Sequence, residues 1–236
     1  MSDCNDDGFV NCHRCAYDDL FVKEVIRTYR RIDAHQDRLD GTTPPKNEGS
    51  DGNLPPIIDA SDGSESALED FDFAVVRYRW EPSAGRDLDT RTFISTPNRK
   101  TNTVGFARRY SDYDYLIWNN DNLQSGVEAV LFSADNYIRD FPLDTNIAID
   151  LCAYWYNTVY TGDLQVEFTT YKGGVMKKDA NTFNFVNEGG TAIQRLIINT
   201  NTMLEIPNGT TDGEHLATLT YNATSRTGTL VKVLKP

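Results

Sequence analysis

Long apolar runs and basic charge are scarce in this sequence of 236 residues. No apolar run approaches the ~20 residues that a membrane-spanning helix needs. The N-terminal residues MSDCNDDGFV are acidic and lack an apolar core, so we expect no secretory signal. With 23 Lys and Arg against 35 Asp and Glu, the formal net charge is −12. This balance opposes binding to nucleic acid or to an anionic membrane, because phosphate binding requires clustered cations.

Catalytic motifs are absent as well. Only three histidines occur, and His215 has no Ser or Cys nucleophile motif beside it. There is no Gly-x-Ser-x-Gly, no His-Glu-x-x-His and no phosphate loop. The spacing of a glycosidase carboxylate pair is set in three dimensions, so an abundance of acidic residues does not indicate one. We therefore expect no enzymatic activity and no obligatory cofactor, with zinc and calcium as the two metals to consider.

Cysteine is rare, and three of the four cysteines lie within the first fifteen residues. Cys4, Cys12 and Cys15 together with His13 would make a Cys3His zinc set, and Cys-x2-Cys is ordinary ligand spacing. Disulfides within this arm or between subunits are the alternative that we favour, and the odd number then leaves one cysteine to pair elsewhere or stay free. Free thiols are the third alternative. Cys152 lies in an apolar run, where we expect a buried, inert thiol.

Residues 17–40 are expected to form a helix. Asp18 or Asp19 can cap its N-terminus, because a carboxylate accepts hydrogen bonds from the first free N–H groups. Apolar residues recur at steps of three and four, which predicts one face that packs on another subunit or in a bundle of identical chains. This oligomerisation stripe consists of Phe21, Val25, Ile32 and Leu39, with Thr28 and His35 in the same seam.

Residues 41–70 are rich in Gly, Pro, Ser, Asp and Asn, which predicts a flexible linker. From residue 71 onward, about ten apolar or alternating runs, among them 126–133 and 214–222, are separated by turn residues, with one helical turn at 135–141. The clearest run, 146–173, predicts two long strands joined by a tight hairpin. The sequence thus predicts an arm and anchor helix (1–40), a linker (41–70) and a head (71–236). The head is expected to be a mainly β, antiparallel β-sandwich of jelly-roll type.

Acidic and amide groups gather at two predicted turns. Asp87 and Asp89 lie at one, and Asp121 lies at the other with Glu128 nearby. Carboxylate oxygens are the ligands that calcium prefers, so these three aspartates are candidate calcium ligands. The same residue types are good turn formers, and that explanation stays open.

Aromatic residues are frequent near the second turn. Tyr113, Tyr115 and Trp118 beside Asn and Asp would make a platform for stacking a sugar, although such residues also fill sandwich cores. Tyr113 and Tyr115 share one face of a strand and Trp118 takes the other, so we expect part of this run to lie at a surface. The three residues are therefore candidates for glycan binding.

Several short motifs of the head, taken together, are similar to those of a known group of proteins. They are Asp87-Leu-Asp89-x-Arg-Thr92, Tyr115-Leu-Ile-Trp118-x-x-Asp121-Asn122, Gly126-x-Glu128, Ala153-x-Trp155-Tyr156 and Tyr171-x-Gly173-Gly174-x-Met176. Together they resemble β-rich structural proteins of tailed bacteriophages, over about residues 85–232. The resemblance implies a virion component, such as a head or neck decoration, a collar or a tail fibre-like protein, and it implies no catalytic residues.

The expected function is therefore a non-enzymatic virion protein, held by its N-terminal segment and displaying a β head. The implied partners are further copies of this chain, other virion proteins and a host-surface glycan. The implied location is the virion, after assembly in the host cytoplasm. The alternatives are a free carbohydrate-binding, lectin-like module and a glycan-cleaving enzyme, which would need two carboxylates ~5–10 Å apart in a cleft.

Overall fold

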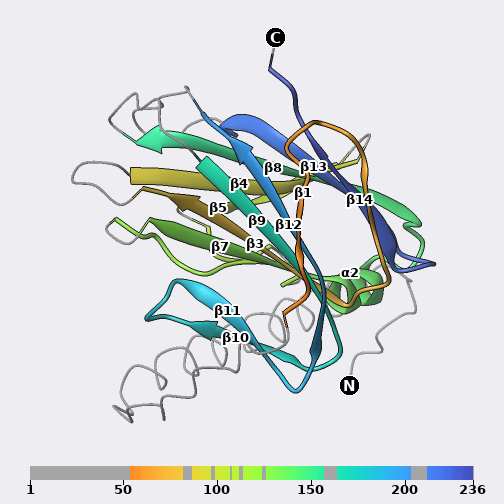
Figure 1. Ribbon diagram of the computed structural model, residues 1–236. Helices are drawn as coiled ribbons and strands as arrows, with labels where there is room; N and C mark the ends of the chain where they lie inside the picture. The colour runs from red at the N-terminus through yellow and green to blue at the C-terminus, as the bar shows by residue number, and fades with distance from the viewer. Residues whose placement is uncertain are drawn as a thin grey trace, which may run out of the picture. The chain divides into compact units, whose positions relative to one another are not determined.

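Fourteen strands and one helix make up the regular structure of the described residues (Figure 1). The computed structural model describes residues 54–81, 87–96, 99–106, 108–111, 114–123, 126–156, 164–202 and 212–235. All of them belong to the unit Asp51–Pro236. The predicted arm and anchor helix therefore lie outside the described residues.

Most strands belong to two six-stranded sheets. In spatial order, sheet A contains β1 (Ile57–Asp59), β12 (Thr191–Thr200), β9 (Leu164–Lys172), β3 (Phe73–Trp80), β7 (Val127–Ser133) and β6 (Leu116–Trp118). Sheet B contains β2 (Ser66–Leu68), β14 (Thr227–Lys232), β13 (Glu214–Asn222), β8 (Asn146–Tyr156), β4 (Asp87–Thr96) and β5 (Arg99–Gly105). Neighbouring strands run antiparallel, apart from the parallel pair β1 and β12. The prediction of a mainly β, antiparallel fold is confirmed.

The alternation of apolar and polar residues explains how the sheets meet. In β9, Leu164, Val166 and Phe168 are fully buried, while Gln165 and Glu167 point to the opposite face. The buried apolar residues of both sheets contribute to one core. Aromatic rings are part of it: Phe71 and Phe132 each lie 5.0–5.3 Å from the ring of Tyr221, between centroids. Two sheets therefore share a single apolar interior.

A two-stranded hairpin packs on the other face of sheet A. It consists of β10 (Val175–Asp179) and β11 (Asn184–Glu188), which pair antiparallel. Phe185 of β11 is buried in a second, smaller cluster with Val75, Ala129, Leu131 and Tyr171 of sheet A. In Figure 1 this hairpin lies beside the strands of sheet A. It covers only part of their outer face.

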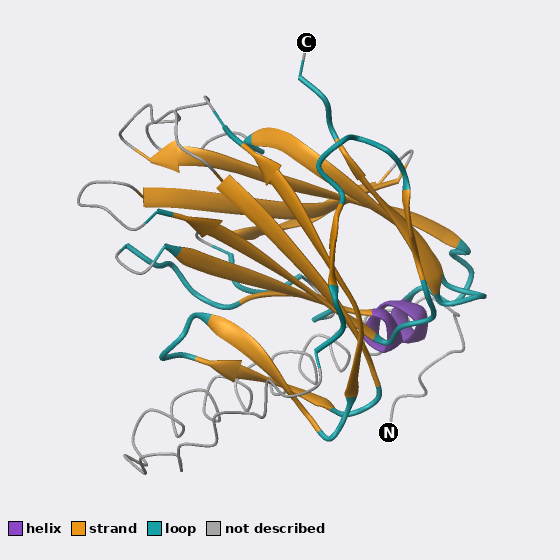
Figure 2. Ribbon diagram, viewed as in Figure 1, coloured by secondary structure: helices purple, strands orange, loops and turns teal. Residues whose placement is uncertain are grey.

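The helix α2 (Ala134–Asp140) follows β7 directly (Figure 2). The Ser133 side chain caps it by accepting a hydrogen bond from the backbone N–H of Asn136, and Pro142 follows its end. The predicted helical turn at 135–141 is thus confirmed. Within the described residues, no helix is long and apolar enough to cross a membrane.

The predicted hairpin at 146–173 is wrong. β8 belongs to sheet B, where it pairs with β13 and β4, whereas β9 belongs to sheet A, where it pairs with β12 and β3. Two consecutive apolar strands can pair with each other, or the chain between them can cross to the facing sheet. The alternation of apolar and polar residues along each strand is the same in both cases. Here both strands have long partners elsewhere, so the chain passes from one sheet to the other.

The predicted linker also needs correction for its described part. Within 54–70, β1 adds a parallel strand to the edge of sheet A, and β2 adds an antiparallel strand to the edge of sheet B. Leu68 and Ala60 are buried in the core between the sheets. Short edge strands are held by backbone hydrogen bonds, so a polar, Gly- and Ser-rich composition does not prevent them.

Candidate metal centre

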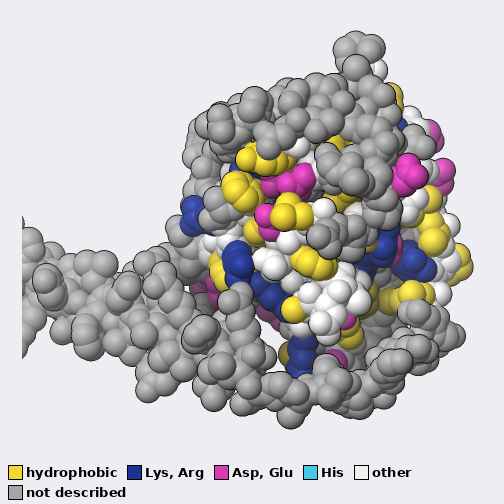
Figure 3. All heavy atoms as spheres, turned by 90° about the vertical axis from the view of Figure 1, so that its left-hand side faces the viewer, with side chains coloured by type: hydrophobic (Ala, Val, Ile, Leu, Met, Phe, Trp, Pro, Cys, Tyr) yellow, Lys and Arg dark blue, Asp and Glu magenta, His cyan; other side chains and the backbone are white. Residues whose placement is uncertain are grey.

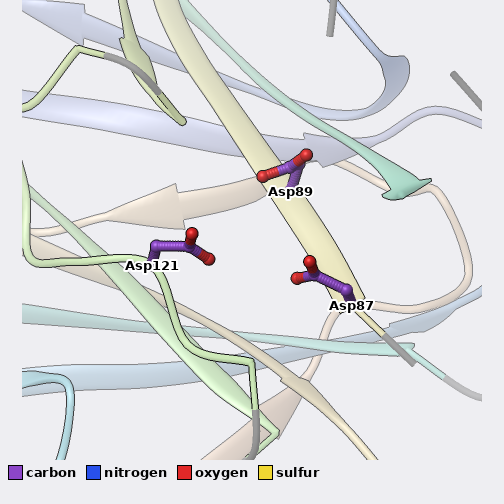
Figure 4. Close-up of side chains that lie close together, drawn as sticks. All are labelled: Asp87, Asp89 and Asp121. Atoms are coloured by element: carbon purple, nitrogen blue, oxygen red, sulfur yellow. The ribbon is translucent and has the colours of Figure 1, made fainter. Parts of the chain in front are cut away.

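The three aspartates predicted as calcium ligands lie together. Asp87 and Asp89 are on β4, and Asp121 lies in the segment after β6. One carboxylate oxygen of each lies within 4.8 Å of those of the other two. Figure 4 shows the three carboxylates turned toward a common space. The structure thus brings together acidic groups from two distant parts of the sequence.

Strand pairing places the two aspartates of β4. Asp87 is opposite Tyr156 of β8, and Asp89 is opposite Tyr154. Residues two apart on a strand share a face, so both carboxylates point to the same side. They lie at the end of sheet B where β4 begins and β8 ends. Figure 3 shows this end of the molecule, where acidic side chains appear among hydrophobic ones.

Hydrogen bonds hold the chain on both sides of Asp121. The backbone N–H of Asn119 donates to the carbonyl of Ala129 at 2.9 Å. The side-chain amide of Asn122 donates to the carbonyl of Val127 at 2.7 Å. This segment is therefore fixed against β7 of sheet A, which positions Asp121 facing β4 of sheet B.

Burial leaves part of the cluster without hydrogen bonds. Asp89 is buried, and Asp87 and Asp121 are half-buried. One oxygen of Asp87 and one of Asp121 are shielded from solvent and have no hydrogen-bond partner. An unsatisfied buried acceptor costs about 1–3 kcal/mol, and more when it is charged. These two oxygens would gain most from a bound cation.

The electrostatics of the cluster favour neutralisation. Burial, followed by repulsion from Asp121 and Asp89, raises the pKa of Asp87 to about 7. Burial also raises the pKa of Asp121 and that of Asp89, although a hydrogen bond from Tyr154 and the charge of Arg91 oppose the shift at Asp89. Carboxylates this close resist joint ionisation without a counter-charge. Either protons or a cation must therefore supply positive charge here at neutral pH.

A fourth acid, Glu128 of β7, lies next to the cluster. It is fully buried, and burial raises its pKa well above the ordinary value, with Asp89 and Asp121 adding repulsion. Its carboxylate accepts hydrogen bonds from Thr90 Oγ1 at 2.8 Å and from Trp118 Nε1 at 3.1 Å. Glu128 therefore joins β4 to β6 and β7 in the interior.

The donor set suits a hard cation. Calcium takes six to eight oxygens and tolerates irregular geometry, whereas zinc prefers four nitrogen or sulfur ligands. Three carboxylates supply oxygen alone, and solvent would complete the coordination of calcium. Magnesium needs near-ideal octahedral geometry and retains several waters. The site therefore fits calcium better than zinc.

The predicted glycan platform does not form from the described aromatic residues. Tyr115 is fully buried and its ring packs edge-on against Tyr137, at 5.3 Å between centroids. Trp118 is 2% exposed and donates its indole N–H to Glu128. Neither ring offers a free face to a sugar, because both belong to the core. Tyr113 lies outside the described residues.

The remaining candidate metal-binding and oligomerisation residues lie outside the described residues. They are the arm residues Cys4, Cys12, His13 and Cys15 and the helix residues Phe21, Val25, Ile32 and Leu39. Cys152 is free and buried, as predicted. The zinc, disulfide and oligomerisation hypotheses therefore stay predictions.

Sequence reasoning missed the residues that support the cluster. Asn122 occurs in a singled-out motif, but its hydrogen bond to Val127 depends on a local fold that composition does not reveal. Tyr154 lies near Asp89 because β4 pairs with β8. Arg91 lies near Asp89 because the two residues are two positions apart on β4 and so share a face. The sequence carried no signal for that pairing.

Comparisons of the chain with family models, with curated proteins and with solved structures found no match. The resemblance to phage structural proteins therefore depends on the motifs alone.

Proposed function

We propose that this chain is a non-enzymatic structural protein of a bacteriophage virion whose head binds a hard divalent cation, calcium foremost. The cation-binding part is carried by one observation: the convergence of Asp87, Asp89 and Asp121, with orphaned buried oxygens on two of them. The virion part is supported by the motif resemblance and by the predicted order of anchor, tether and head. A head displayed in many copies would turn weak contacts into avidity.

The arrangement of the strands supports a sandwich of jelly-roll type. Consecutive strands alternate between the sheets: β3 is in sheet A, β4 and β5 in sheet B, β6 and β7 in sheet A, and β8 in sheet B. Such crossing connections are typical of jelly rolls and of other Greek-key sandwiches. The cation would then join a loop of one sheet to a strand of the other at the end of the sandwich.

The geometry supports joint coordination of one ion. Calcium holds its oxygen ligands at about 2.3–2.6 Å, so two ligands of one ion lie at most about 5 Å apart. One oxygen from each of the three aspartates meets this limit, because the three lie within 4.8 Å of one another.

Calorimetric titration of the chain with CaCl2 tests the cation site. We expect saturable binding of one ion and a rise in melting temperature that EDTA reverses, because a ligand bound only by the folded state stabilises it. Absence of both effects, for calcium and for magnesium, would remove the proposal. Light scattering on the full chain tests the virion part separately, because a multimeric anchor predicts an oligomer and a monomer argues against it.

The alternative is a free carbohydrate-binding module. Burial of Tyr115 and Trp118 removes ring stacking as its support, so a sugar would have to coordinate the cation directly. A glycan panel, tested with and without calcium, separates the two functions. Sugar binding that needs calcium, by a monomer, would favour the lectin-like module.

A further inference from the structure

Three arginines surround one glutamate on the outer face of sheet A. The four residues are Arg77 and Arg79 of β3, Glu167 of β9 and Arg195 of β12. Arg79 Nε donates to Glu167 Oε2 at 2.9 Å. The other oxygen, Oε1, lies 3.4 Å from Arg77 Nη1 and 3.4 Å from Arg195 Nη2. A single carboxylate is thus shared by three guanidinium groups.

The cluster carries excess positive charge. Burial acts to raise the pKa of Glu167, but the three arginines outweigh it, so the pKa lies below its ordinary value and the carboxylate is ionised. Three guanidinium groups against one carboxylate leave a formal charge of +2. This local excess occurs in a chain whose net charge is −12.

Arg77 serves the structure. It is 5% exposed, and its Nε donates to Asn184 Oδ1 of β11 at 2.7 Å. Its terminal nitrogens also contact Thr169 Oγ1 at 2.9 Å and the Tyr171 hydroxyl at 3.3 Å. One of its donors therefore attaches the β10–β11 hairpin to sheet A, and the others bind side chains of β9 within the sheet.

Arg79 and Arg195 retain donors that have no hydrogen-bond partner among the described residues. Within the described residues, the Arg79 guanidinium contacts Glu167 through Nε alone, and 40% of the side chain is exposed. Arg195 contacts Glu167 through Nη2, while its Nε is shielded from solvent without a hydrogen-bond partner. Both guanidinium groups are anchored by the same carboxylate, one at each oxygen. The Arg195 Nε–H is closed to a ligand from solvent, so the terminal N–H groups of the two side chains are the donors that an anion would meet.

We propose that Arg79 and Arg195, held by Glu167, bind a single oxyanion group: a carboxylate, a sulfate or a phosphate. The planar guanidinium fork matches such groups and forms charge-assisted hydrogen bonds with them. The ligand carries few charges, because a chain of net charge −12 repels a polyanion such as nucleic acid at long range. This site is independent of the cation site and of the virion function.

Isothermal titration of the whole chain with sodium sulfate, sodium phosphate and sodium glucuronate tests the proposal, with sodium chloride at equal ionic strength as the reference. We expect saturable binding of one anion in the millimolar range for at least one of the three. Glucuronate binding would indicate a sugar-borne carboxylate, and binding of sulfate or phosphate alone would indicate an inorganic group. No saturable heat beyond that of chloride would overturn the site.

Variants locate the binding. Arg79→Gln and Arg195→Gln should each weaken the anion at least tenfold. Arg139→Gln is the matched control, because it removes the same charge from a side chain that is 60% exposed and bound to Asp140. Sulfate stabilises many proteins by exclusion, so the dependence on Arg79, and not a melting shift alone, is decisive. Arg79→Gln tests the site even where Arg195→Gln does not fold, and equal affinities of Arg79→Gln and Arg139→Gln would refute it.

Discussion

Asp87 begins a strand of sheet B and Asp121 follows a strand of sheet A, yet an oxygen of one carboxylate lies within 4.8 Å of an oxygen of the other. Folding thus forces two like charges together at the end of the two sheets. The cost of this contact must be offset by protons or by a cation. Two of the predictions below distinguish these two means of neutralisation.

Without metal, the protein should become less stable as pH rises from 5 to 8. Asp87 has a pKa of about 7 in the folded state, against about 3.9 in an unfolded chain. Between these values the folded state holds the extra proton, so the free energy of unfolding falls as pH rises through the window. Because Asp87 is partly exposed, we expect a loss of about 1–2 kcal/mol, measured by urea unfolding in EDTA.

The variant Asp87→Asn separates this effect from that of His215. A hydrogen bond to Asp150, partly opposed by burial, raises the pKa of His215, and its stabilisation is also lost as pH rises through that pKa. Both groups therefore act with the same sign. In the variant, the pH dependence of the free energy of unfolding should keep the contribution of His215 and lose that of Asp87. An unchanged pH dependence in Asp87→Asn would contradict the raised pKa of Asp87.

Replacing Asp121 should have opposite effects on the free and the calcium-bound protein. Asp121→Asn removes one repelling charge, so without metal it should be more stable by about 0.5–1 kcal/mol. It also removes a charged ligand, so calcium affinity should fall at least tenfold, or about 1.4 kcal/mol. Asp62→Asn is the charge-matched control, since Asp62 is exposed and lies between β1 and β2, outside the three-aspartate cluster. Thermal melts with calcium and with EDTA measure both effects, and parallel behaviour of the two variants would contradict the site.

Local patterns predicted many strands of the head, because each depends on side chains close in sequence, but they missed β1 and β2 in the predicted linker. The run 126–133 was expected from its apolar residues and corresponds to β7, and 214–222 corresponds to β13. Pairing was not predictable in the same way. The alternation of β8 and β9 shows which side chains face inward, but it does not show that the two strands lie in different sheets.

The candidate site was predicted in part. Asp87, Asp89 and Asp121 were grouped because acidic residues near turns are typical calcium ligands. Their surroundings depend on long-range register, such as Asp89 opposite Tyr154. The burial of Trp118 was also not predictable, since an aromatic residue on a strand suits a core and a surface equally.

The segment before residue 71 should stabilise the head. Its removal deletes β1 and β2, the burial of Leu68 and Ala60, and the hydrogen bond from the Ala60 N–H to the Ile197 carbonyl. We expect a fragment of residues 71–236 to be less stable than one of residues 51–236 by on the order of 3–5 kcal/mol. Urea midpoints measure the difference. Equal midpoints would mean that these residues are a linker, as their composition predicted.

Glu128 should be the most sensitive acidic residue of the described head. It is fully buried and accepts hydrogen bonds from Thr90, from the Trp118 indole and, at 3.3 Å, from the backbone N–H of Asn122. Glu128→Ala leaves these donors without their acceptor and opens a cavity, so we expect a loss of about 3–5 kcal/mol. At a pH where the Glu128 carboxylate is ionised, Glu128→Gln keeps the shape of the side chain but places an amide N–H donor against these donors, which should cost about 1–3 kcal/mol.

Glu188→Gln is the control for the two Glu128 variants. Glu188 forms an exposed ion pair with Lys177, and the loss of this ion pair should cost less than about 0.5 kcal/mol. Urea unfolding followed by tryptophan fluorescence measures all three variants. The loss of stability should be largest for Glu128→Ala, smaller for Glu128→Gln and smallest for Glu188→Gln. This order follows from the number of buried donors that each change leaves unsatisfied. If Glu128→Gln were as stable as the wild type, the carboxylate would have to be protonated in the native state, because only the neutral acid resembles the amide in donating a hydrogen bond.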